Sequence, residues 1–161
     1  MNNEKFTISL GNLEEIIAAF FLIITTALVI LNIIMRYFLN SGIIWSEEVA
    51  TGCFVWSVFI GAIAAFKHRG HVGVDILVKL LPPTLRWGVN LLMDVILVLL
   101  NGYMAYLACL YVAITHTKMT PVLGVSSAYI SSAVPIAFVM MTFYALRFVW
   151  QDLTTKREVA K

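Results

Sequence analysis

Residues 16–35 read IIAAFFLIITTALVILNIIM, a stretch without a single charged side chain. A helix rises about 1.5 Å per residue, so roughly 20 residues cross the roughly 30 Å hydrocarbon core of a membrane. Further charge-free runs follow at 49–66 and 119–146, and the run 87–115 is interrupted only by Asp94. Inside a membrane every backbone amide needs a partner within the protein, and long unbroken runs meet this need as helices. We therefore predict an all-α integral membrane protein with four transmembrane helices.

The composition supports the same class. Of the 161 residues, 61% are hydrophobic and only 12% are charged, with a mean hydropathy of +0.91, whereas soluble domains carry about 25% charged residues. The length suits one helical unit, so residues 1–161 are predicted to form a single domain. A net charge of +2 without a basic patch argues against nucleic-acid binding. The predicted spans are approximately 14–37, 47–67, 87–115 and 120–148.

The distribution of basic residues predicts the orientation. Of the 11 Lys and Arg residues, only Arg36 and Lys118 lie outside the N-terminal tail, the second loop and the C-terminal tail. Cytoplasmic segments carry the excess of Lys and Arg, so both termini are expected in the cytoplasm. The first apolar run is too long for the core of a signal peptide and no small-x-small cleavage site closes it, so the first span is expected to be retained. Residues 73–81, GVDILVKLL, resemble a short amphipathic helix on the membrane surface. Residues 36–48 are expected to lie in the outer interface.

Asp94 is the clear case of an ionisable residue within a predicted span. At 100° per residue, Asn90, Asp94 and Asn101 lie within about 40° of one another on one helix face. Such a polar stripe is expected to face protein, because an ionisable group facing lipid is costly. Asp94 therefore either bonds a neighbouring helix, reaches towards the surface, or serves as the coupling carboxylate of a carrier.

Charged residues also meet at the predicted outer boundary. Arg36 ends the first predicted helix, while Glu47 and Glu48 open the second beside Trp45. An ion pair between Arg36 and one of these carboxylates would fix the hairpin. The same groups would equally serve to bind another protein, and both interpretations stay open at this point.

The residues give little basis for catalysis or for a bound cofactor. Cys53 and Cys109 stand alone in apolar runs, which predicts neither a redox pair nor a zinc site. His68 and His71 follow the second span on the inside, whereas His116 follows the third on the outside, so they cannot share one haem. No catalytic or phosphate-binding motif occurs. We predict a protein that is not an enzyme and has no catalytic residues, cofactor or metal.

Several short motifs follow one another in a fixed order along the chain. They are WSEE at 45–48, GAIAAF at 61–66, KHRGHVGVD at 67–75 and LP at 81–82, preceded by Asn32 and Arg36. In order and spacing they resemble the small permease subunit of tripartite ATP-independent periplasmic (TRAP) transporters. The resemblance covers nearly the whole chain in length, helix count and loop order.

This resemblance implies a multi-pass protein of the bacterial inner membrane that contacts membrane lipid and a large TRAP permease subunit. The large subunit would hold the substrate and sodium sites, and a periplasmic substrate-binding protein would deliver an organic acid of the dicarboxylate or sialic-acid class. The small subunit would scaffold the large one. The positions that match the family pattern, with expected interface or structural roles, are Trp45, Glu47, Glu48, Arg69, His71 and Asp75. The alternative is a self-sufficient homodimeric carrier that uses Asp94.

Overall fold

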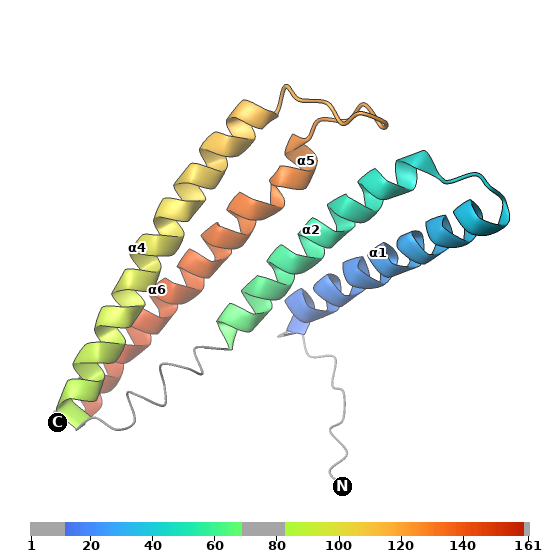
Figure 1. The fold of residues 1–161 in the computed structure, drawn as a ribbon. Coiled ribbons are helices and arrows are strands. Elements are labelled where there is room, and N and C mark those ends of the chain that lie inside the picture. The colour runs from blue at the N-terminus through green and yellow to red at the C-terminus, as the bar shows by residue number, and fades with distance from the viewer. Residues whose placement is uncertain (1–11, 69–82, 160–161) are drawn as a thin grey trace, which may run out of the picture.

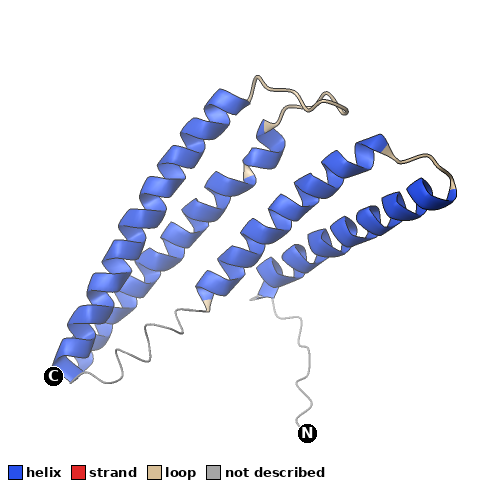
Figure 2. Ribbon diagram, in the orientation of Figure 1, coloured by secondary structure: helices blue, strands red, loops and turns tan. Residues whose placement is uncertain are grey.

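The computed structural model describes residues 12–68 and 83–159, and every regular element in these ranges is a helix (Figure 2). The helices are α1 (Leu13–Phe38), α2 (Ile44–Lys67), α4 (Pro83–Thr115), α5 (Ala128–Ser131) and α6 (Ala133–Val159). Four stretches are long and apolar enough to cross a membrane: Leu13–Phe38, Ile44–Lys67, Gly88–Thr115 and Ala128–Thr154. The predicted class, an all-α protein with four transmembrane helices, is confirmed.

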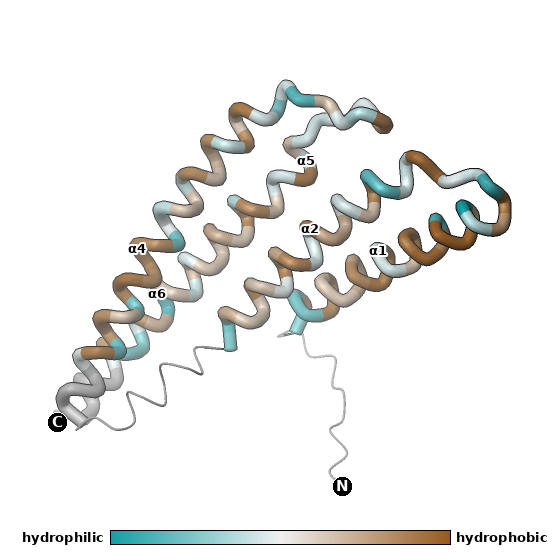
Figure 3. The backbone as a smooth tube through the Cα atoms, viewed as in Figure 1, coloured by the Kyte–Doolittle hydropathy of each residue, from teal (hydrophilic) through white to brown (hydrophobic). Residues whose placement is uncertain are grey.

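The long helices form a single layer in the order α1, α2, α6, α4 (Figure 1). Each packs against its neighbour in that order, and no comparable contact joins α1 to α4 in the described ranges. The neighbours α1 and α2 run in opposite directions, as do α4 and α6, whereas α2 and α6 in the middle of the layer run in the same direction. We call the end with residues 39–43 and 116–127 the loop end, and the end where α1 begins and α6 ends the terminal end. Figure 3 shows that hydrophobic residues run along the helices, with hydrophilic ones more frequent near these ends.

The layer forms because α2 has two packing sides that lie nearly opposite each other. Ser57 and Gly61 face α1, while Phe59, Ile63 and Phe66 face α6. At 100° per residue, the members of one set lie roughly 120–180° around the helix from the members of the other. Small residues on one side allow close approach of α1, and the bulky side fills the wider contact with α6.

The contact between α1 and α2 is close. Ser57 Oγ donates a hydrogen bond to the Ala18 carbonyl oxygen at 2.8 Å, and a Cβ at Gly61 would lie 3.8 Å from the Ala18 Cβ. About two turns further along α1, Thr25 Oγ1 lies 3.4 Å from the Ala50 carbonyl oxygen. The face of α1 that carries Ala18 and Thr25 therefore packs against α2.

The contact between α2 and α6 is built from larger side chains. Phe66 stacks on Phe148 with ring centroids 6.1 Å apart, and Ile63 forms a core cluster with Ala137 and Met141. These buried groups are the centre of the layer.

The fourth span differs from its prediction. It was expected to begin at 120, but helix begins only at Ala128. Residues 119–127 form a closed loop, in which Thr120 N donates to Val125 O and Ser127 N donates to Lys118 O, each at 2.8 Å. Gly124 has φ 64°, which a glycine adopts without strain. A charge-free run reports polarity rather than conformation, and turn-forming Pro121 and Gly124 decide the backbone here.

Other boundaries differ as well: the third helix begins at Pro83 rather than at 87, and the fourth continues to Val159 rather than to 148. The second helix begins at Ile44 rather than at 47. Helix α5 ends before α6 begins because Pro135 has no N–H to donate to the carbonyl of Ser131, four residues earlier. The predicted amphipathic segment 73–81 lies outside the described residues.

Candidate functional site

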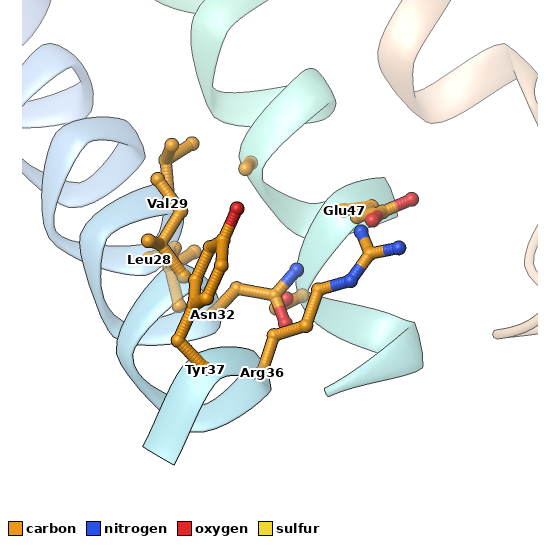
Figure 4. Close-up of a pocket in the computed structure, with 9 residues that line it drawn as sticks. Leu28, Val29, Asn32, Arg36, Tyr37 and Glu47 are labelled. Atoms are coloured by element: carbon orange, nitrogen blue, oxygen red, sulfur yellow. The ribbon is translucent and has the colours of Figure 1, made fainter. Parts of the chain in front are cut away.

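A groove with a volume of about 490 Å³ lies between α1 and α2 at the loop end (Figure 4). We call it the α1–α2 groove. Its apolar wall comes from Leu28, Val29, Ile33 and Ala50, and its polar groups are Asn32, Arg36, Tyr37, Ser46 and Glu47. Two of these polar groups are already bonded. Asn32 Oδ1 accepts the Ile43 amide at 2.8 Å, and Ser46 Oγ donates to the Ile43 carbonyl at 2.7 Å.

Arg36 and Glu47 both line the α1–α2 groove (Figure 4). Among the described side chains, no ion pair joins Arg36 to Glu47 or to Glu48, whereas Lys67 pairs with Glu14 and His68 with Glu15. The hairpin is fixed instead by Asn32, which bonds the backbone at the start of α2. Arg36 therefore does not form the internal ion pair of the first interpretation. The second interpretation, that Arg36 binds another protein, stays a prediction.

Glu48 has a different role from Glu47. Its Oε1 accepts the Val122 amide at 2.8 Å and its Oε2 accepts the Leu123 amide at 3.0 Å. One carboxylate on α2 therefore holds two successive amides of the loop 119–127. Beneath this contact lies a cavity of about 210 Å³, lined by residues that include Phe21, Cys53, Trp56, Tyr129 and Ile130.

The terminal end contains a cluster that the sequence reasoning missed. Lys67 Nζ lies 2.9 Å from Glu14 Oε2, and Tyr144 Oη donates to Glu14 Oε1 at 2.7 Å, so Glu14 joins α1, α2 and α6. His68 Nε2 lies 2.8 Å from Glu15 Oε1. The contact between the carboxylates Glu14 and Glu15 and the basic residues Lys67 and His68 could have been predicted from the sequence, because an antiparallel hairpin brings the start of α1 beside the end of α2. The position of Tyr144 had no comparable signal.

Asp94 lies on the side of α4 that packs against α6. Asp94 and Asn90 are half-buried there. The same stripe carries the buried residues of α4, which are Asn101, Ala105, Ala108 and Thr115. The prediction that this polar stripe faces protein is confirmed. Asn101 Nδ2 and Thr115 Oγ1 donate to carbonyl oxygens of their own helix, at 2.8 Å and 2.7 Å. Neither of the two loop-end cavities described above includes Asp94.

The remaining predicted residues fall into two groups. Trp45 lies half-exposed at the loop end, whereas Arg69, His71 and Asp75 lie outside the described residues. His68 and His116 are at opposite ends of the layer, as their order along the chain predicted. In the part of the chain that the structure describes, no group of three His, Cys, Asp or Glu side chains is arranged to hold a metal ion, and Cys53 and Cys109 are free thiols.

Comparison with known proteins gives a consistent result. Residues 25–155 match the sequence model of "Tripartite ATP-independent periplasmic transporters, DctQ component". A TRAP transporter small permease protein of Haemophilus influenzae is 32% identical over 138 residues, which cover 86% of this chain and 84% of that protein. The C4-dicarboxylate TRAP transporter small permease protein DctQ of Vibrio cholerae is 40% identical over 75 residues, 47% of this chain and 32% of that protein.

A third relative is longer than this chain. The sialic acid TRAP transporter permease protein SiaT of Haemophilus influenzae is 25% identical over 134 residues, which cover 83% of this chain but only 22% of that protein. The family match covers most of the chain, and the first relative is similar along nearly its whole length. The chain therefore belongs to the DctQ component family of TRAP transporters, as a small permease subunit that crosses the bacterial inner membrane several times.

Proposed function

We propose that this subunit scaffolds a large permease subunit, which carries out sodium-coupled uptake of an organic acid delivered by a periplasmic binding protein. The observation that carries the proposal is the single layer of helices α1, α2, α6 and α4. A transport pathway needs protein walls on all sides of the solute, and a layer one helix thick supplies one wall. The pathway therefore belongs to the partner.

The relatives support a large membrane partner. The segment of SiaT that matches this chain is only 22% of that protein, so a related unit exists within a much longer permease. The names of two relatives include C4-dicarboxylate and sialic acid, both of them carboxylic acids. This supports an organic acid as the substrate class here, with the choice of acid made by the other subunits.

The charge distribution supports an orientation with the terminal end in the cytoplasm. The loop end, with Arg36 and the loop 119–127 that Glu48 holds, would then face the periplasm. A binding protein arriving from the periplasm would meet these groups.

A self-sufficient homodimeric carrier is the second candidate, and Asp94 is the observation that favours it. An ionisable residue within a transmembrane helix is often part of a coupling mechanism. Against this, Asp94 lies in the seam between α4 and α6 rather than on an open face.

One experiment separates the candidates. The tagged chain is extracted from its native membrane in mild detergent, and co-purifying proteins are identified by mass spectrometry. The scaffold proposal expects a stoichiometric larger membrane protein. It also expects Asp94→Asn to retain at least about half of sodium-driven uptake in liposomes that contain all subunits. Uptake by this chain alone, abolished by Asp94→Asn, would establish the homodimeric carrier instead.

A further inference from the structure

Two tyrosines lie deep in the membrane-spanning part of α4. This part is Gly88–Thr115, so its middle falls between residues 101 and 102. At 1.5 Å per residue, the Cα atoms of Tyr103 and Tyr106 lie about 2 Å and about 7 Å from the middle along the helix axis, while half the hydrocarbon core is about 15 Å thick. Long side chains on a helix point towards its N-terminus, which directs the Tyr106 hydroxyl back towards the middle.

Both tyrosines are exposed on the side of α4 that no other described helix covers. Their exposed fractions are 62% for Tyr103 and 61% for Tyr106, and neither hydroxyl forms a hydrogen bond with another described residue. A phenol in hydrocarbon has no acceptor, so tyrosines in membrane proteins favour the interface with water. The other exposed tyrosines follow this rule, because Tyr37, Tyr111 and Tyr129 all lie at or near the loop end.

The opposite edge of the layer, α1, has a different surface (Figure 1). Its large exposed side chains near mid-helix are hydrocarbon only: Phe20, Leu22, Ile23, Val29, Ile30 and Leu31. The hydroxyl of exposed Thr26 is satisfied, because it donates to the Leu22 carbonyl at 2.9 Å. The α1 edge therefore suits lipid, whereas the α4 edge presents two hydroxyls that lipid tails cannot satisfy.

The surface beside the tyrosines leaves room for another backbone. Apart from the adjoining residues and the backbone of α4 itself, no described atom lies within 4 Å of the position that a Cβ on Gly102 would occupy. Tyr106, Cys109 and Ala113 continue the same helix face, and the last two are small and exposed. Small residues allow a second membrane helix to approach closely, which brings its acceptor groups within reach of the tyrosine hydroxyls.

We propose that the face of α4 formed by Gly102, Tyr103 and Tyr106, here called the α4 tyrosine face, docks a transmembrane helix of the large permease subunit. The proposal rests on the scaffold function above and specifies which edge of the layer carries it out. The docked helix is apolar and presents acceptors at this depth, either Ser, Thr or Asn side chains or backbone carbonyls freed at Gly or Pro. The α1 edge faces lipid.

Site-specific photo-crosslinking tests the assignment. The photoreactive residue p-benzoylphenylalanine is placed at Tyr103 or Tyr106, and, as matched controls of similar depth, at Val29 or Ile30 of α1. The complete transporter is irradiated in native membranes. The expected result is a crosslink to the large subunit from the α4 positions and none from the α1 positions.

The outcomes separate this proposal from the one on which it rests. Crosslinks to the large subunit only from α1 would overturn the docking edge and leave the scaffold function in place. Crosslinks between two copies of this chain, or to lipid alone, would also overturn it. Failure of any large permease to co-purify would overturn the scaffold function itself, and the docking edge with it.

A second measurement tests the hydroxyls. The double variant Tyr103→Phe, Tyr106→Phe keeps both rings and removes only the donors. Two interhelical hydrogen bonds in a membrane correspond to a roughly five- to tenfold weaker association, measured as the dissociation constant between the two subunits in lipid nanodiscs. The control Tyr111→Phe, at the boundary, is expected to leave this constant unchanged. An unchanged constant in the double variant would overturn the proposal.

Discussion

At the scale of single residues, the adjacent carboxylates Glu47 and Glu48 have different roles because their oxygens make different contacts. Glu48 uses both oxygens on consecutive amides of one loop, at 2.8 Å and 3.0 Å. Glu47, one residue earlier, is exposed and lines the α1–α2 groove. The pair of glutamates that opens α2 therefore combines an internal clamp with a group available to a partner.

The clamp makes a prediction for Glu48→Gln. An amide side chain has one acceptor oxygen, so one of the two loop amides loses its partner, and bonds to an uncharged acceptor are weaker. We expect backbone amides at Val122 and Leu123 to exchange with deuterium roughly tenfold faster. Hydrogen–deuterium exchange with mass spectrometry measures this in detergent. The control Glu47→Gln should leave exchange in the loop unchanged, and equal rates in both variants would refute the clamp.

Glu14 makes a second residue-scale prediction, because it binds Lys67 and Tyr144 at once. Tyr144→Phe removes one hydrogen-bond donor and keeps the ring, which is expected to lower the free energy of unfolding by about 1 kcal/mol. In a Glu14→Ala background the same substitution should cost nearly nothing, because the acceptor is absent. Thermal unfolding of the four proteins of this cycle measures the coupling.

A control is available for that cycle. Tyr129→Phe removes a hydroxyl that is exposed at the loop end and bonds no described residue. It should not change the melting temperature. Additive costs for Glu14→Ala and Tyr144→Phe would show that the 2.7 Å bond contributes nothing to stability.

At the scale of elements, the seam between α1 and α2 explains why these helices approach closely. Ala18 meets Gly61, and Ser57 adds a hydrogen bond to the Ala18 carbonyl at 2.8 Å. Small residues and weak hydrogen bonds across a short gap are a common means of holding membrane helices together. A register shift of one residue would place Ile17 or Ala19 opposite Gly61 and would break the hydrogen bond from Ser57 to the Ala18 carbonyl oxygen, so the register rests on these few contacts.

The register can be tested with a disulfide. A Cβ at Gly61 would lie 3.8 Å from the Ala18 Cβ, within the roughly 3.5–4.5 Å that disulfides require. In a background with Cys53→Ala and Cys109→Ala, the variant Ala18→Cys, Gly61→Cys should form an intramolecular disulfide on mild oxidation. Mass spectrometry after peptide digestion detects it. The pair Ala19→Cys, Gly61→Cys should not crosslink, and equal crosslinking of both pairs would contradict the register.

Much of the element pattern was predictable from hydropathy, and the exceptions have a physical cause. The runs that contain Ala18, Ser57 and Asn101 are helical because an uncharged run in a membrane has no better way to satisfy its backbone. The predicted start of the fourth helix was wrong. Residues 119–127 are as uncharged as the first part of the helix that follows, but they form a loop at the loop end. There Pro121 and Gly124 favour a turn and Glu48 supplies the missing acceptors.

At the scale of the whole molecule, the spatial order of the helices could not be predicted from the sequence. Four spans are compatible with a closed bundle or with a layer, and hydropathy is the same in both. The polar stripe of Asp94 and Asn101 was correctly expected to face protein, but not to face α6 in particular. The cluster of Glu14, Lys67 and Tyr144 depends on the same order, which explains why only its charged members carried a sequence signal.

In a single layer, every helix is uncovered on the two surfaces of the layer. This arrangement leads to a prediction about stability. Among the described residues, the buried hydrophobic ones are few and mostly alanine, and the larger ones are only Ile63, Met141 and Phe148. The isolated chain should therefore unfold at a low temperature in detergent. A partner that binds the folded layer stabilises it by about 4 kcal/mol at a thousandfold excess over its dissociation constant, which corresponds to a rise in melting temperature of roughly 10 °C. The melting temperature of this subunit is measured as its loss from the monodisperse peak in size-exclusion chromatography after heating. It should rise by this amount when the large permease is co-expressed. Co-expression of an unrelated membrane protein should leave it unchanged. If the isolated chain melts at the same temperature as the assembled one, the layer is stable by itself and its open faces need no protein partner.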